Sequence, residues 1–205
     1  MGLGRSTFLS AVALAGVTLL SPGKVSAQPT QTIYNTSYPS VVRVAIRQNN
    51  NPYGPILWVQ TVGFEEYCSD VLSNEWVPSW KAQSLRAGAI AVKMFAWHHT
   101  LHPVTIGGWT FDVDNTTNFQ EYKYMSGTPQ TDAAIKATWN LVYTPPTGEI
   151  LALDYRAGTP FNANWSFIGS NMMSQLGSEY WASIGQLDYT HILSLYYPGR
   201  SLRGV

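Results

Sequence analysis

The segment SWKAQSLRAGAIAVKMFAWHHT, residues 79–100, carries the strongest helix signal in the sequence. Its apolar residues recur at the spacing of one helix face, which holds Leu85, Ala89, Val92 and Ala96. Ser79 is of the type that caps helix N-termini, and Gly88, among alanines, lets another element approach closely. The segment therefore predicts a long helix that begins at Ser79 and packs closely against a neighbour.

The residues before this helix predict a shorter helix and a β-hairpin. In GFEEYCSDVLSN, residues 63–74, apolar side chains follow the i, i+3, i+4, i+7 pattern, and Cys68 lies on that face as a small buried hydrophobe. The segments SVVRVAIRQ (40–48) and ILWVQTV (56–62) predict strands, and the stretch between them is rich in Asn, Pro and Gly. We expect the two strands to pair as a hairpin.

The residues after the long helix predict several short elements. Pro103 and the Gly107–Gly108 pair end the helix. The patterns that follow predict a loop or short strands (111–125), a helix running into a strand (132–144), a strand from Glu149 to Tyr155 after a turn, and two short helices within 173–199. Strands and helices do not alternate as in βαβ units, so we expect a single domain of the α+β class with alanine-rich helices.

The N-terminal residues predict an export signal. Arg5 precedes an apolar run from Phe8 to Leu20, and the small residues at 25–27 are typical of a cleavage site, so residues 1–27 predict a signal peptide. A retained N-terminal anchor is the alternative. Residues 28–39 predict a polar leader. No second long apolar run follows, so we expect the mature chain to be secreted or held in the cell envelope, outside the membrane.

Composition excludes some partners and favours others. The 205-residue chain has 12 basic and 12 acidic residues, and removal of the predicted signal peptide takes away two basic ones. Such a balance excludes a nucleic-acid partner, which needs a basic surface. Cys68 is the one cysteine, so neither an internal disulfide nor a cysteine zinc cluster is expected. Aromatic residues make up 13%, with eight tryptophans; a single aromatic more often packs in a core, but as a group they are compatible with a carbohydrate or protein ligand.

Five blocks of sequence occur in an order that resembles a known family. They are FEEYCSDVLSNEWVPSW, SLRAGAIAVKMFAWHH, DVDNTTNFQEY, MSQLG and HILSLYYPG. In this order they resemble the stage II sporulation protein D and amidase-enhancer family, over a domain of residues 40–200. The resemblance implies a protein directed at peptidoglycan. It implies either a lytic transglycosylase that cleaves glycan strands, or a non-catalytic peptidoglycan-binding protein that recruits or enhances a cell-wall amidase.

The resemblance also implies a set of site residues. Glu75, in SNEW, falls on the glutamate taken as the family's catalytic acid. The residues implied to bind substrate are Lys93, Gln120, Tyr122, Ser174 and Gln175. We expect all six to lie in an open groove within reach of one ligand.

The sequence departs from the family pattern at three places. DNTTNFQ holds none of the cysteines or histidines that bind zinc in some members, no histidine lies shortly before Met173, and Gly88 replaces a frequent glutamine. His98, His99 and His102 have no acidic or cysteine ligand close in sequence, and Pro103 disfavours helix at His102. We therefore expect no metal and no cofactor. The departures favour the binding-protein alternative, whereas the intact block around Glu75 favours the enzyme.

Lytic transglycosylation needs a single carboxyl group, protonated near neutral pH. Trp76 and Trp80 beside Glu75 would supply apolar surroundings that raise the pKa of its carboxyl group. The alternative is that Glu75 only supports the start of the helix at Ser79, where negative charge is favourable. A carboxylate brought in by the fold, such as Asp112 or Asp114, would instead position a water for hydrolysis.

Overall fold

The computed structural model describes residues 39–159 and 166–205. The predicted signal peptide and all of the predicted leader except Pro39 lie outside these residues. The helices are α1 (Phe64–Glu75), α2 (Ala82–Leu101), α3 (Pro129–Thr138), α4 (Gln175–Ser183), α5 (Tyr189–Tyr196) and the short 3-10 turn η1 (Gln48–Asn50). The strands are β1 (Val41–Arg47), β2 (Ile56–Gly63), β3 (Val104–Ile106), β4 (Trp109–Phe111), β5 (Val113–Asp114), β6 (Leu141–Thr144), β7 (Asp154–Arg156), β8 (Met172–Ser174) and β9 (Ser201–Gly204). None of the helices in the described ranges has the length and apolar character needed to cross a membrane.

The strands form small, separate sheets. β1 pairs antiparallel with β2, as the predicted hairpin requires, and parallel with β5 on its other edge. The remaining sheets are pairs: β3 with β4, β6 with β9, and the parallel pair β7 with β8. Helices and short sheets without βαβ alternation confirm the predicted α+β class.

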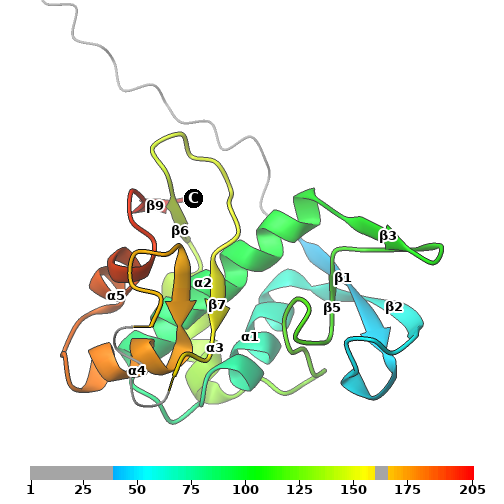
Figure 1. The fold of residues 1–205 in the computed structure, drawn as a ribbon, viewed down its shortest axis with the longest axis horizontal. Coiled ribbons are helices and arrows are strands. Elements are labelled where there is room, and N and C mark those ends of the chain that lie inside the picture. The colour runs from blue at the N-terminus through cyan, green and yellow to red at the C-terminus, as the bar shows by residue number, and fades with distance from the viewer. Residues whose placement is uncertain (1–38, 160–165) are drawn as a thin grey trace, which may run out of the picture. The chain divides into compact units, whose positions relative to one another are not determined.

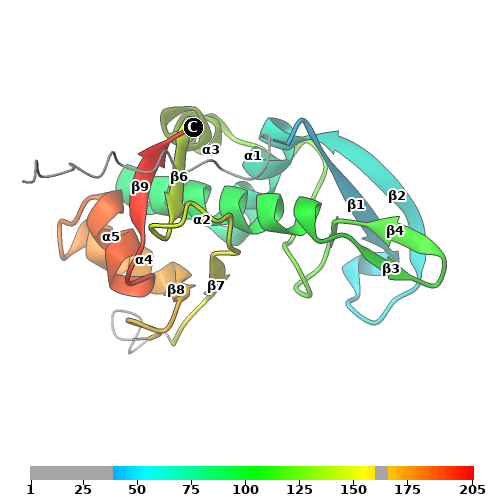
Figure 2. The same ribbon diagram turned by 90° about the horizontal axis from the view of Figure 1, so that it is seen from above.

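Helix α2 is the central element of the described domain. It contacts α1, α3, α4 and α5, and its C-terminal part approaches β1 and β5. Figures 1 and 2 show α2 running through the middle, with α4 and α5 beside one end and the β1–β4 strands beside the other. The segment with the strongest helix signal is therefore the one around which the other elements pack.

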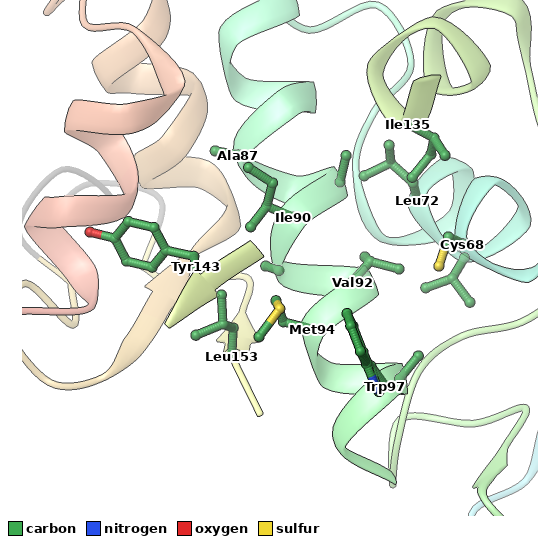
Figure 3. Close-up of a cluster of buried hydrophobic side chains, with 14 of the residues drawn as sticks. Cys68, Leu72, Ala87, Ile90, Val92, Met94, Trp97, Ile135, Tyr143 and Leu153 are labelled. Carbon is green, nitrogen blue, oxygen red and sulfur yellow. The ribbon is translucent and has the colours of Figure 1, made fainter. Parts of the chain in front are cut away.

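The core surrounds α2 on more than the single face predicted from its sequence. Every residue from Ala87 to Trp97 is buried. In Figure 3, one side of α2 faces Tyr143 and Leu153, and the other faces side chains of α1 and α3, among them Cys68, Leu72 and Ile135. Cys68 is fully buried, as predicted. A helix buried on all sides has apolar residues around its whole circumference, which explains its high alanine content.

Gly88 is the point of closest approach between α2 and its neighbours. A Cβ atom at this position would lie 2.7 Å from ring carbons of Trp76. The Trp76 indole therefore occupies the space that a side chain at position 88 would need. This contact confirms the predicted close packing, and it gives the physical reason why this chain has no glutamine at that position.

Two local predictions were wrong. Helix α2 begins at Ala82, and Ser79 does not cap it; the backbone N–H of Lys81, its N-cap residue, donates to Glu179 Oε2 at 2.9 Å. The strand predicted from Glu149 to Tyr155 is limited to β7, Asp154–Arg156. Helix α2 ends at Leu101, before Pro103, and the Gly107–Gly108 pair that follows forms the turn of the β3–β4 hairpin, where both glycines have positive φ.

Candidate functional site

Glu75 is the last residue of α1, and two donors hold its carboxyl group. The backbone N–H of Glu121 donates to Oε1 at 2.8 Å, and the Gln175 amide donates to Oε2 at 3.0 Å. The same Gln175 nitrogen also donates to the Glu75 carbonyl at 2.6 Å. The side chain is half-buried, so its carboxyl group is oriented by the protein while part of it stays accessible.

A pocket of about 900 Å³ opens beside this carboxyl group. Glu75 and Gln175 line it together with the aromatic residues Phe95, Phe119, Tyr155 and Phe167. Amide side chains from Asn74 and Asn118 contribute polar edges. Its size lies within the usual range for small-molecule sites, and its lining combines aromatic surfaces with hydrogen-bonding groups.

Burial raises the pKa of the Glu75 carboxyl group, and the negative charge of Glu121 raises it further. The two hydrogen bonds to the carboxylate act in the opposite direction but do not cancel this effect. The position at the C-terminal end of α1 is also unfavourable for a negative charge. The fold therefore raises the pKa of Glu75, in the direction predicted from the sequence.

The apolar surroundings of Glu75 come from other residues than predicted. The ring of Trp76 packs against Gly88 and against the edge of Tyr155, and its Nε1 donates to Ser178 Oγ at 3.0 Å. Neither Trp76 nor Trp80 is among the pocket residues. Phe95, Phe119 and Tyr155, which lie far from Glu75 in sequence, take that place.

Ser174 and Gln175 occupy the junction between β8 and α4. The Ser174 hydroxyl caps α4, accepting from the Gly177 N–H at 2.9 Å and donating to the Ala157 carbonyl at 3.2 Å. Ser174 is fully buried, so it orients the first residue of α4, Gln175, toward Glu75 instead of facing the pocket.

Gln120 and Tyr122 lie beneath the pocket and are not among its lining residues. Gln120 is fully buried; it accepts from the Tyr67 hydroxyl at 2.9 Å and donates to the Tyr155 hydroxyl at 2.9 Å and to the Val92 carbonyl at 3.3 Å. The Tyr122 ring stacks on Tyr67 with centroids 5.4 Å apart. Gln120 therefore supports the pocket residue Tyr155, and Tyr122 packs against Tyr67, which donates to Gln120.

Lys93 lies away from the pocket. Lys93 precedes Phe95, a pocket residue, by two positions, which places the two side chains more than half a turn apart around α2. Its Nζ donates to the carbonyls of Thr138, Trp139 and Leu141 at 2.6, 2.8 and 2.6 Å. The side chain is 1% exposed, and burial lowers its pKa to about 7. In this fold, Lys93 ties α2 to the end of α3 and the start of β6.

The predicted groove therefore brings together two of the six candidate residues, Glu75 and Gln175. It also contains residues that the sequence did not single out, notably Glu121, Asp154 and Tyr155. Glu121 lies between Gln120 and Tyr122, which are both buried, whereas Glu121 is exposed. No alternation of apolar and polar residues marks Glu121 in the sequence, because its neighbour Gln120 is polar although buried. Tyr155 belongs to no motif and is brought in by the β7–β8 pairing.

The two aspartates suggested as distant partners of Glu75 have other roles. Asp112 pairs with Arg43 at 2.5 Å, and Asp114 pairs with Arg47 at 2.6 Å. Both ion pairs fasten the segment around β5 to β1, and both aspartates are buried. Glu121 and Asp154 are the acidic residues that share the pocket with Glu75.

The alternative role of Glu75 at the start of the long helix is wrong. Glu75 lies at the C-terminal end of α1, and Glu179 of α4 supplies the carboxylate that accepts from the first turn of α2. The histidines at the end of α2 pack together, with the rings of His98 and His102 stacked at 4.3 Å. Within 39–159 and 166–205, no group of three or more His, Cys, Asp or Glu side chains is placed to hold a metal ion.

A second pocket, of about 670 Å³, lies between the start of α1 and α3. Its charged residues are Glu65, Glu66, Asp132 and Lys136. None of the six candidate residues lines it, so it is separate from the Glu75 pocket.

Comparison with known proteins agrees with the resemblance inferred from the sequence. Residues 53–144 match the stage II sporulation protein family, SpoIID, which confirms the resemblance for this part of the chain. The matched range includes Glu75, Lys93, Gln120 and Tyr122 but ends before Ser174 and Gln175. An uncharacterized protein of Brachyspira hyodysenteriae is 36% identical over 72 residues, which cover 35% of this chain. The match spans 19% of that protein's own length.

Proposed function

We propose, from the match of residues 53–144 to the stage II sporulation protein family, that this chain is an exported lytic transglycosylase that cleaves the glycan strands of peptidoglycan. Glu75 is the acid/base of the reaction. The observation that carries the proposal is its carboxyl group, which two donors orient at the edge of an aromatic-lined pocket and whose pKa burial raises. Glu75 lies within the residues that match the family.

A single carboxyl group in this setting can perform the reaction. Protonated Glu75 donates its proton to the glycosidic oxygen as the bond from that oxygen to the anomeric carbon breaks. The resulting carboxylate then accepts the proton of the 6-hydroxyl of the same sugar while that oxygen bonds to the anomeric carbon. The products are a 1,6-anhydro end and a new free 4-hydroxyl end, and no water is consumed. Gln175 and the Glu121 N–H keep the carboxyl group oriented during both transfers.

Export places the enzyme where its substrate lies. The signal-peptide pattern of residues 1–27 supports secretion or retention in the cell envelope. The near balance of acidic and basic residues provides no excess of positive charge for a densely charged polyanion such as nucleic acid.

The pocket contains two further acids, so water could replace the sugar hydroxyl as the attacking group. Glu121 and Asp154 are both exposed and both line the pocket. Glycosidases that use two carboxyl groups position a water or form a covalent intermediate with the second one. The lytic reaction is favoured because the Glu121 backbone, rather than its side chain, is the group fixed against Glu75.

The products distinguish these mechanisms. Purified mature protein is incubated with peptidoglycan glycan strands, with and without stem peptides, in heavy-oxygen water, and the fragments are weighed by mass spectrometry. We expect unlabelled 1,6-anhydro ends. Labelled reducing ends would show a hydrolase and overturn the transglycosylase assignment.

A non-catalytic role is the second candidate. Lys93, Gln120 and Ser174, three of the residues implied to bind substrate, are committed to bonds within the fold. This supports a protein that binds peptidoglycan and recruits or enhances a cell-wall amidase. Strands that bind the protein but give no fragments, together with faster amidase action in its presence, would favour this candidate.

A further inference from the structure

The turn of residues 121–127 is attached to the pocket at both ends. The Glu121 N–H donates to Glu75, and Glu121 lines the pocket. Near the other end, Asn74, also a pocket residue, donates from its amide to Ser126 Oγ at 2.7 Å. The tip of the turn, at Tyr124 and Met125, therefore lies beside the pocket on the α1 side.

The tip is held in one conformation from below. The Asp70 carboxylate, buried on α1, accepts from the backbone N–H groups of Met125 and Gly127 at 3.0 and 2.8 Å. Met125 has a φ of 57°, which is unfavourable for a residue with a side chain. The Asp70 bonds maintain this conformation, and strained backbone of this kind persists where the surroundings fix it.

Two large side chains project from this fixed tip. Tyr124 is 60% exposed and Met125 is 76% exposed. The residues on either side of them, Lys123 and Ser126, are polar. No hydrogen bond to the Tyr124 hydroxyl is present within the described part of the chain. A flat ring with a polar end, ordered in advance, can bind a ligand with little loss of conformational freedom.

We infer that Tyr124 and Met125 form a platform on which a further sugar ring of the bound glycan strand rests, outside the pocket. This inference rests on the proposed function, since it assigns the same ligand to an adjoining surface. A glycan strand is a polymer, so it must leave a pocket of about 900 Å³ over one of its edges. The attachment of the turn to Glu75 and Asn74 makes its tip continuous with the pocket.

Binding as a function of strand length tests the platform. The parent is the Glu75→Gln variant, which prevents cleavage, and the probes are glycan fragments of graded length from peptidoglycan freed of stem peptides. We expect Tyr124→Ala to weaken the binding of the longest fragments by roughly five- to tenfold and to leave the affinity for the shortest fragments unchanged. Tyr124→Phe should retain the parent's affinity because the ring provides the surface. Tyr53→Ala is the matched control, since Tyr53 is 95% exposed on the β1–β2 turn.

The outcomes separate the platform from the proposed function. Equal binding by Tyr124→Ala and the parent, or an equal loss for short and long fragments, would overturn the platform alone. A parent that binds no fragment of any length would overturn the proposed function and the platform with it. Melting temperatures of all variants identify any loss that reflects unfolding.

Discussion

Glu75 and Lys93 each place an ionisable group at the C-terminal end of a helix, Glu75 on its own helix α1 and Lys93 from the middle of α2 onto the end of α3. Lys93 places its ammonium group on three carbonyls at and just beyond the end of α3, where a positive charge is favourable. Glu75 places a carboxyl group at the end of α1, where a negative charge is unfavourable. Lys93 completes the hydrogen bonding at the end of α3, whereas Glu75 donates to none of the carbonyls at the end of α1.

The difference supports a structural role for Lys93 and the proposed chemical role for Glu75. Every donor of the Lys93 ammonium group has a partner, and the side chain is fully enclosed. Glu75 is half-buried, faces a pocket and has a raised pKa, so its proton can be transferred to a ligand. The resemblance to the stage II sporulation family implies a site role for both residues, whereas their surroundings favour such a role for Glu75 alone.

The largest effect should come from Glu75→Gln. The amide keeps the shape and can still accept from one of the two donors, but it cannot donate a proton to the glycosidic oxygen. We expect glycan cleavage to fall by roughly a thousandfold or more, with binding and melting temperature nearly unchanged. Fragment release from purified strands measures the rate. Cleavage at the original rate would mean that another group does the chemistry, and unfolding would mean that Glu75 is structural.

Lys93→Met should affect stability and not the pocket. The substitution removes the ammonium group that donates to three backbone carbonyls. Methionine no longer has to bury a charge, but this gain in stability offsets only part of the lost hydrogen bonding. We expect the free energy of unfolding to fall by about 2–4 kcal/mol, measured by denaturant unfolding. Lys136→Met is the control, because Lys136 is an exposed lysine of α3, the helix whose end Lys93 contacts, and its replacement should cost less than about 0.5 kcal/mol. A stable Lys93→Met protein that has lost glycan binding would contradict the structural role.

The smallest effect should be a shift in pH dependence from Glu121→Gln. The proposed reaction needs protonated Glu75, so its rate should decline as pH rises through the pKa of the Glu75 carboxyl group. The negative charge of Glu121 raises that pKa, so its removal should move the decline to lower pH. We expect a shift of less than about one pH unit, because Glu121 is exposed and its charge is screened.

Glu66→Gln is the control for this shift. It makes the same charge change in the first turn of α1, at the opposite end of the helix from Glu75, and should leave the pH profile in place. A profile that moves equally in both variants would indicate an effect of net charge rather than of the pocket.

The sequence alone predicted the elements that depend on local patterns. The period of apolar residues identified α1, α2 and α5, and turn residues between two alternating segments identified the β1–β2 hairpin. The boundaries of α2 and β7 were wrong because they depend on tertiary partners. Glu179, which accepts from the N-cap residue of α2, lies 98 residues from Lys81 in the chain.

The sequence also singled out Glu75 as an acid, from the block around it. Only the tertiary structure decided what surrounds that acid. Gln175 reaches it across 100 residues of chain, and Phe95 and Tyr155 come to the same pocket from α2 and β7. The same packing turned Lys93 toward α3 and buried Gln120 beneath the pocket wall. Periodicity and turn preference are properties of neighbouring residues, whereas desolvation and hydrogen-bond partners depend on segments that meet only in the folded chain.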